Sequence, residues 1–191
     1  MEKLNGYDEA QAITGEFEIL QPGGYICQIT GAKEQISSTN KKMLVIAFDI
    51  CEGDSAGFYK RKYDEAVKNA TLDRPAKWSG VYRQMLDGEK SAGYLKGLMT
   101  SLEASNQGFK WDWKEEKLKD LKFGGIFGRE EYEKFDGTRA FATKLKFIRT
   151  IEKVKTGDFK IPEDKLLPEQ NNEMNFDKFD SITSENNDLP F

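Results

Sequence analysis

The sequence predicts a mainly β domain of five strands, with a helix between the third and fourth strands and an acidic tail at the C-terminal end. Three observations support this fold class. Apolar and polar residues alternate in several short runs, turn-forming residues separate these runs, and one segment after residue 90 has apolar residues at helical spacing. The chain has 191 residues, 38% of them hydrophobic. A folded part of about 150 residues is large enough to bury an autonomous core.

The first three strands are predicted from alternation between polar turns. The first follows the turn at 21–24 and ends at the polar cluster 37–40. The second covers 42–52, where Leu44, Ile46, Phe48 and Ile50 share one face. A third strand is predicted at 58–63, directly after a glycine-rich turn.

The second half of the body is predicted to be one helix followed by a hairpin. Residues 64–90 lack a clean period and are interpreted as a long, partly helical connection. Ser91 is expected to begin an amphipathic helix. The last two strands are predicted at 123–132 and 139–155, joined by a turn with Asp-Gly. This order of elements is that of a five-stranded OB barrel. A generic α+β sandwich is the alternative fold.

The charge distribution divides the chain into a body, residues 1–155, and a tail, residues 156–191. The net charge of the whole chain is −4. Residues 157–191 have nine acids and three lysines, whereas residues 1–156 have a net charge of +2. The tail also contains three of the five prolines and few apolar residues. It buries too little surface to offset its ordering entropy, so we expect it to be disordered.

The composition excludes several chemistries. The sequence has no histidine, so histidine-assisted nucleophiles and imidazole-containing zinc sites are excluded. The two cysteines are 24 residues apart, without a C-x-x-C motif. No nucleotide-hydrolysis motif is present. We therefore expect no catalytic residues, no metal site and no cofactor. The longest apolar run is 43–48, and the N-terminal end lacks the apolar segment of a secretory signal, so a cytoplasmic protein without a membrane partner is predicted.

Aromatic and basic residues are concentrated between residues 58 and 83. This segment has five aromatic residues and seven basic residues against three acids. Single-stranded nucleic acid binds to such mixtures, because basic groups follow the phosphates and exposed rings stack on the bases. The candidate DNA contacts are Phe58, Tyr59, Lys60, Arg61, Lys62, Tyr63, Trp78, Tyr82 and Arg83. The alternative is an edge strand whose aromatic residues are in the core and whose charges prevent aggregation.

The predicted fifth strand adds three candidate contacts: Lys144, Lys146 and Arg149. Lys144 and Lys146 would share one strand face, and the opposite face, with Phe141, Leu145 and Phe147, would pack against the barrel. Trp111 and Trp113 are interpreted either as rings that stack on bases or as apolar cover over the helix.

The C-terminal residues are Asp188, Leu189, Pro190 and Phe191. An apolar end on an acidic tail is suited to docking, because Phe191 and Pro190 fit an apolar pocket while Asp188 and the terminal carboxylate meet basic residues. This end resembles bacterial single-stranded DNA-binding proteins, whose OB domain is followed by a disordered tail ending in Asp-(Ile/Leu)-Pro-Phe. The body looks more similar to divergent OB-type binding proteins of phages of Gram-positive bacteria. Asn186 and Asn187 stand where the bacterial family often has acids.

The resemblance implies a protein that is not an enzyme, works in the bacterial host cytoplasm, and binds and protects single-stranded DNA without strong sequence preference. The tip would recruit replication, recombination and repair proteins, with Phe191 as anchor and Asp188 as main acidic contact, and would compete with DNA for the basic groove. A homo-oligomer would strengthen weak sites through effective concentration. Two alternatives stay open. One is a DNA-processing enzyme or nuclease subunit using carboxylates such as Glu130, Glu131 and Glu163; the other is a phage interaction protein without DNA affinity.

Overall fold

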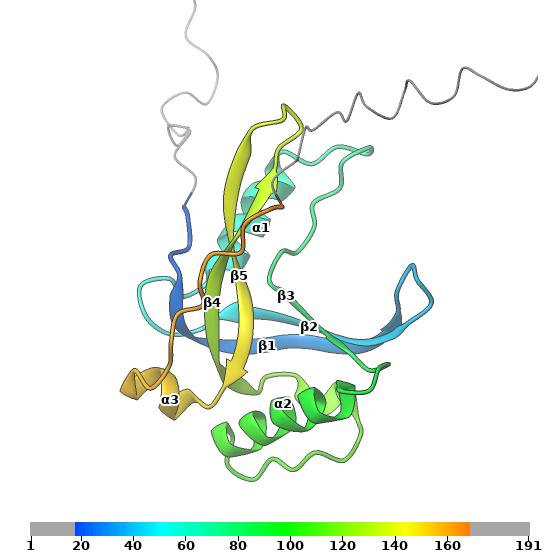
Figure 1. The fold of residues 1–191 in the computed structure, drawn as a ribbon, viewed down its shortest axis with the longest axis vertical. Coiled ribbons are helices and arrows are strands. Elements are labelled where there is room, and N and C mark those ends of the chain that lie inside the picture. The colour runs from blue at the N-terminus through cyan, green and yellow to red at the C-terminus, as the bar shows by residue number, and fades with distance from the viewer. Residues whose placement is uncertain (1–17, 169–191) are drawn as a thin grey trace, which may run out of the picture.

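The computed structural model describes residues 18–168, which form one antiparallel sheet with helices packed around it (Figure 1). The elements follow one another as β1 (Gly23–Ile36), β2 (Lys42–Ile50), α1 (Phe58–Lys68), β3 (Val81–Met85), α2 (Ser91–Ser105), the 3₁₀ helix η1 (Glu115–Leu118), β4 (Lys122–Glu133), β5 (Arg139–Arg149) and α3 (Ile151–Thr156). The prediction of a mainly β fold with five strands, and a helix between the third and fourth, is confirmed.

The five strands are ordered β3-β2-β1-β4-β5, and every neighbouring pair is antiparallel. Strand β1 is the centre of the sheet and pairs with both β2 and β4. In Figure 1, β4 and β5 cross the direction of β1 and β2, and their hairpin extends beyond the rest of the sheet. Strands β3 and β5 are the two edges, and no pairing joins them within residues 18–168. The sheet is therefore open rather than a closed barrel.

The core is built around the ring of Phe48, which is buried on β2. Its centroid lies 5.2 Å from that of Tyr59, 5.7 Å from that of Phe123 and 6.1 Å from that of Phe127, all in edge-to-face arrangements. Such aromatic pairs add to the stabilisation that comes from burying their surface. The core thus joins α1, β2 and β4, which are far apart in the sequence.

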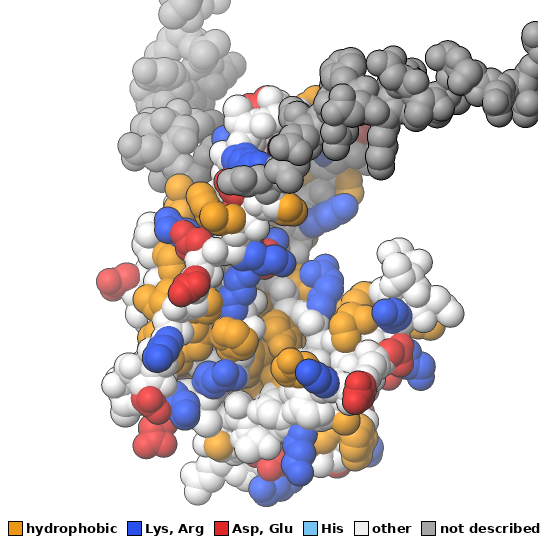
Figure 2. All heavy atoms as spheres, viewed as in Figure 1, with side chains coloured by type: hydrophobic (Ala, Val, Ile, Leu, Met, Phe, Trp, Pro, Cys, Tyr) orange, Lys and Arg blue, Asp and Glu red, His pale blue; other side chains and the backbone are white. Residues whose placement is uncertain are grey.

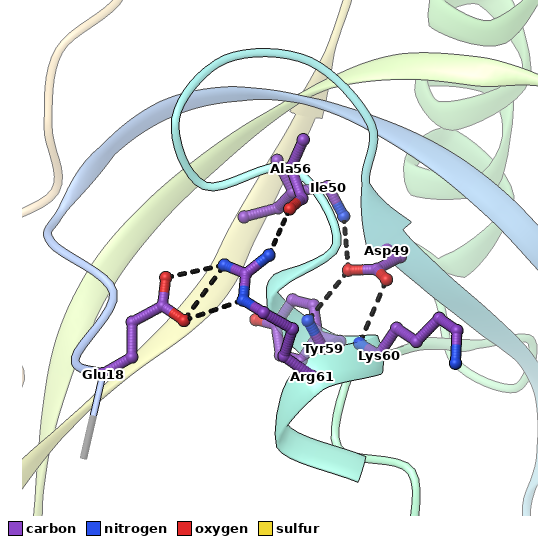
Figure 3. Close-up of polar contacts among 7 residues, drawn as sticks. All are labelled: Glu18, Asp49, Ile50, Ala56, Tyr59, Lys60 and Arg61. Atoms are coloured by element: carbon purple, nitrogen blue, oxygen red, sulfur yellow. Dashed lines mark hydrogen bonds and ion pairs between the residues drawn. The ribbon is translucent and has the colours of Figure 1, made fainter. Parts of the chain in front are cut away.

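Helix α1 replaces the third strand that was predicted at 58–63. Asp49, at the end of β2, accepts hydrogen bonds from the backbone N–H groups of Tyr59 (2.9 Å) and Lys60 (3.1 Å), as Figure 3 shows. These N–H groups belong to the first turn of a helix, where they have no intrahelical partner. Gly57, at the N-cap, has a φ of 74°, which favours glycine. The carboxylate of Asp49, which lies outside residues 58–68, therefore stabilises this segment as a helix.

Strand β3 lies inside the segment that was interpreted as a connection. It pairs with β2 from Ala47 opposite Val81 to Met43 opposite Met85. Its inward side chains include Gln84, which is buried and donates a hydrogen bond to the carbonyl of Met85 (2.9 Å). Because a polar residue stands on the buried face, the sequence lacks the apolar alternation that predicts a strand.

The last strand ends earlier than predicted. Residues 139–155 were expected to be one strand, but β5 ends at Arg149 and α3 follows. The hydroxyl of Thr150 accepts a hydrogen bond from the backbone N–H of Lys153 (3.4 Å), which caps the new helix. Gly157, with a φ of 71°, then ends it.

Residues 157–168, here called the strap, pack against β4. The backbone N–H of Lys165 donates to the carbonyl of Arg129 (3.0 Å), and the N–H of Glu131 donates to the carbonyl of Lys165 (2.8 Å). The ring of Phe159 lies against Gly24, where an added Cβ would be only 2.5 Å away. The prediction of a disordered tail from residue 156 onward is therefore wrong for the strap. The rest of the tail, with the tip Asp188–Phe191, is outside the described residues.

Candidate nucleic-acid interface

The basic and aromatic residues at the start of α1 have structural roles. Phe58 and Tyr59 are buried in the core, each with 5% of its surface exposed. This burial removes both rings from the set of candidate base contacts. Lys60 forms an ion pair with Asp64 at 2.7 Å, and the guanidinium of Arg61 pairs with Glu18 at 2.8 Å (Figure 3). Both candidate cations are thus already matched by carboxylates.

The next three candidate DNA contacts, Lys62, Tyr63 and Trp78, also interact with other residues of the chain. The ammonium group of Lys62 lies 5.9 Å from the centre of the Phe58 ring. Tyr63 packs on Trp78, with ring centroids 5.6 Å apart. The indole N–H of Trp78 donates to the backbone carbonyls of Phe48 (3.2 Å) and Gly80 (3.1 Å). The Trp78 ring is therefore fixed in place beside the edge of the sheet and only partly exposed.

Strand β3 places Tyr82 and Arg83 on opposite faces. Arg83 is opposite Val45 in the register and is exposed on the outer face of β2 and β3. Tyr82 is opposite the buried Ile46, so it points to the inner side. Burial raises the pKa of Tyr82, and the positive charge of Arg149 acts in the opposite direction. Tyr82 is therefore partly buried on the inner side, and Arg83 is the exposed basic residue of β3.

A β-bulge turns Phe147 to the outside of the sheet. In the register, Ile126 is opposite Phe147 and Phe127 is opposite Leu145, so Lys146 is the extra residue. The bulge interrupts the alternation that placed Phe147 on the same face as Leu145. Phe147 is 47% exposed, and the guanidinium of Arg149 lies 5.1 Å from its ring centre. The prediction that Phe147 packs in the core is wrong.

The two predicted lysine contacts of β5 share one carboxylate. Lys144 pairs with Glu130 at 2.7 Å, and Lys146 forms a hydrogen-bonded ion pair with the other oxygen of the same carboxylate. These hydrogen bonds lower the pKa of Glu130 from 4.5 to about 2, so it is ionised at neutral pH. The three groups together contribute one positive charge instead of the two that the sequence predicted.

The extended β4–β5 hairpin was not predicted to be a candidate surface. Tyr132, Phe135 and Phe141 are all exposed on it. The guanidinium of Arg129 lies 5.1 Å from the ring centre of Phe141 and also pairs with Asp164 of the strap. Phe135 was interpreted only as part of a turn, and Phe141 as part of the core. The Phe-Asp-Gly turn was the available signal for Phe135, because a turn residue between two strands lies at the surface.

The described surface therefore brings together two groups of aromatic and basic residues. The seam cluster is Phe147 and Arg149, near the end of the edge strand β5. The hairpin cluster is Arg129 and Phe141, which share one face of the β4–β5 hairpin, with Arg129 also paired with Asp164. Figure 2 shows Lys and Arg side chains among hydrophobic ones over the middle of the face on which β5 lies in front. This combination is suited to phosphates and bases.

The carboxylates of β4 are partners of basic side chains. Glu131 pairs with Arg139 at 3.4 Å and accepts a hydrogen bond from the backbone N–H of Leu167 (3.0 Å). Together with the two lysines on Glu130, this pairing favours a structural role over a catalytic one. Within residues 18–168, no group of three His, Cys, Asp or Glu side chains is placed to hold a metal ion.

No protein-family model matches this sequence, and the comparison with curated proteins gave no match. Among the described helices, none has the length and apolar character needed to cross a membrane. Function is therefore inferred from the fold and from the surface described above.

Proposed function

We propose that this chain is a non-catalytic OB-type protein that binds single-stranded DNA through its body and recruits other proteins through its C-terminal tip. By its resemblance to the bacterial and phage single-stranded DNA-binding proteins, it would act in the cytoplasm of a bacterial host. DNA replication, recombination and repair proteins would be its partners.

The strand order supports an OB-type body. OB folds are five-stranded Greek-key barrels that are partly open, and they bind oligonucleotides on the face of strands 2 and 3 and on the loops 1–2 and 4–5. Here α2 stands between β3 and β4, and the sheet is open between β3 and β5. Arg83 lies on the outer face of β2 and β3, and the hairpin cluster lies on the two strands that flank the loop between β4 and β5.

The seam cluster is the observation that carries the proposal of DNA binding. It places a half-exposed ring and a guanidinium beside each other at the open edge of the sheet. No carboxylate within residues 18–168 forms an ion pair with Arg149. A ring that stacks on a base contributes about 1–3 kcal/mol, and an unmatched guanidinium can replace a counterion at a phosphate.

The first test is a titration of the purified chain with oligo-dT and with a duplex of equal length, at two salt concentrations, followed by tryptophan fluorescence. We expect oligo-dT to change the fluorescence, the binding to weaken with salt, and the duplex to bind much more weakly. Absence of binding at low salt, confirmed by gel shift, would favour the interaction protein without DNA affinity. Magnesium-dependent degradation of DNA that is lost in Glu130→Gln would favour the nuclease alternative.

Two variants of the seam cluster separate stacking from charge. Phe147→Ala is expected to weaken oligo-dT binding roughly 5- to 150-fold at every salt concentration, because it removes a stacking ring. Arg149→Ala is expected to weaken binding and also to reduce the slope of log affinity against log salt by about 0.7, since one phosphate contact is lost. Tyr94→Ala is the control, because Tyr94 is an exposed ring on α2 outside both clusters. Equal binding by all three variants would contradict the seam cluster as the DNA site.

A further inference from the structure

The strap places a carboxylate on the guanidinium of the hairpin cluster. The Nε–H of Arg129 donates to one oxygen of Asp164 (2.9 Å), and Nη2 of Arg129 pairs with the other oxygen. A guanidinium recognises phosphate with the same fork of two parallel hydrogen bonds. The pair also neutralises the charge of Arg129. While Asp164 is in place, a DNA phosphate therefore finds neither the charge nor these two donors available.

The first half of the strap, residues 157–162, is packed against the body. The ring of Phe159 covers Gly24, and Pro162 lies against Gly128. An added Cβ at Gly128 would be 3.1 Å from the Cβ of Pro162, so the strap and β4 are in close contact there. Removing such apolar contacts returns buried surface to water, which is unfavourable. This half is therefore an anchor.

The second half of the strap is held mainly by polar contacts with β4, beside which the strap lies in Figure 1. Lys165 forms backbone hydrogen bonds with Arg129 and Glu131, and the N–H of Leu167 donates to the Glu131 carboxylate (3.0 Å). The side chain of Leu166 is 63% exposed, so this half buries little apolar surface. Water or another polar ligand can replace hydrogen bonds of this kind at little net cost. The second half can therefore leave β4 while the first half stays packed.

We infer that Asp164 is an autoinhibitory substitute for a DNA phosphate on Arg129. This inference rests on the proposed function and adds a regulation of the same surface. When single-stranded DNA reaches the hairpin, a phosphate replaces the Asp164 carboxylate on the guanidinium, and the second half of the strap is released from β4. Arg129 then contributes its charge to DNA binding, next to the exposed ring of Phe141.

This contact is independent of the C-terminal tip. Asp164 lies on a segment that pairs with β4, and its carboxylate touches one guanidinium directly. The tip begins 24 residues further along the chain. Deleting residues 184–191 would therefore leave the pair between Arg129 and Asp164 in place.

The first test compares Asp164→Asn with Glu163→Gln in the full-length chain. Both variants lose one negative charge from the strap, but Glu163 is exposed and forms no ion pair within residues 18–168. We expect Asp164→Asn to bind oligo-dT about two- to fivefold more tightly, because an exposed ion pair no longer has to be broken. Glu163→Gln should bind within about 1.5-fold of the native chain, since solvent screens a charge that makes no contact.

The second test follows the strap itself by amide hydrogen exchange, measured by NMR. The N–H of Lys165 donates to the carbonyl of Arg129, so its exchange reports release of the second half. We expect saturating oligo-dT to speed up this exchange at least twofold in the native chain. The amide of Ile29, a buried core residue, is the internal control and should not exchange faster.

The outcomes separate this inference from the proposed function. If oligo-dT does not bind the native chain at low salt, both fail. If oligo-dT binds but the Lys165 amide exchanges at the same rate or more slowly, DNA does not release the strap and only the inference fails. Equal affinities of Asp164→Asn and Glu163→Gln would also overturn the inference alone, because the effect would then be one of net charge.

Discussion

The carboxylate of Glu130 determines the charge of the surface around the β5 bulge, because it lies between the ammonium groups of Lys144 and Lys146. Hydrogen bonds from these two lysines hold its pKa at about 2. The folded state therefore binds a proton at this carboxylate less readily than the unfolded chain does, and stability depends on pH through Glu130.

We expect Glu130→Gln to lower the free energy of unfolding by about 1–2 kcal/mol at pH 7, because charge-assisted hydrogen bonds are lost. The contribution of the ionised carboxylate is fully present above about pH 4.5 and is lost as the pH falls toward 2. Urea unfolding at several pH values should therefore show the difference between the native chain and Glu130→Gln disappearing at low pH.

Glu133→Gln is the matched control for this prediction. Glu133 is exposed on the same strand, and no ion pair of Glu133 is found within residues 18–168. Its substitution should change stability by less than about 0.5 kcal/mol. A difference between native and Glu130→Gln chains that is constant from pH 7 to pH 2.5 would show that the lysines do not stabilise the ionised form.

At the scale of the element, α1 depends on one side chain of β2. Asp49 accepts hydrogen bonds from the N–H groups of Ile50, Tyr59 and Lys60 (Figure 3). The negative charge also lies at the positive end of the helix dipole. The helix in turn carries Phe58 and Tyr59 into the core, so capping and core packing are coupled.

Asp49→Ala is expected to lower the free energy of unfolding by about 2 kcal/mol, because three backbone donors lose their acceptor. Asp64→Ala, which removes the exposed partner of Lys60 on the same helix, should cost less than about 0.5 kcal/mol. Urea unfolding compares the two variants. Equal losses would show that the cap contributes no more than a surface ion pair.

At the scale of the whole molecule, we expect the strap and the remaining tail to have different roles. The strap covers Gly24 with Phe159 and pairs Asp164 with Arg129. Residues 169–191 have a net charge of −5, and they end in the apolar tip. Repulsion from these acids would oppose the approach of DNA to the basic surfaces.

Two truncations test this division. Ending the chain at residue 168 should leave the melting temperature unchanged and give equal or tighter oligo-dT binding, because only the acidic segment is removed. Ending it at residue 156 should lower the free energy of unfolding by about 2–4 kcal/mol, since the Phe159 contact and the Arg129 pair are lost. Calorimetry and the oligo-dT titration measure the two effects.

The tip is tested separately by deleting residues 184–191. Recruitment of partner proteins should be lost, while DNA binding stays equal or becomes tighter. Weaker DNA binding after this deletion would contradict the proposed division between body and tip.

The sequence by itself determined the elements whose patterns are local. Alternation predicted β1, β2 and β4, helical spacing predicted α2, and the Asp-Gly turn predicted the β4–β5 hairpin. These local patterns also predicted the fold class, a strand-rich fold with one helix before β4. Their signals are visible because each buried face is apolar over a whole run of residues.

Only the tertiary structure decided the remaining features, because each depends on a residue far away in the sequence. The hydrogen bonds that Asp49 accepts stabilise residues 58–68 as a helix. Pairing with β2 makes residues 81–85 a strand despite the buried Gln84. Backbone hydrogen bonds with β4 position the strap. For the candidate site, Arg83 and Arg149 were predicted to contact DNA; both are exposed in the structure, and their contact with DNA stays a prediction. The bulge that exposes Phe147, and the carboxylate shared by Lys144 and Lys146, follow from the pairing of β4 with β5. Strand register and side-chain pairing are properties of the assembled sheet, and composition alone does not contain them.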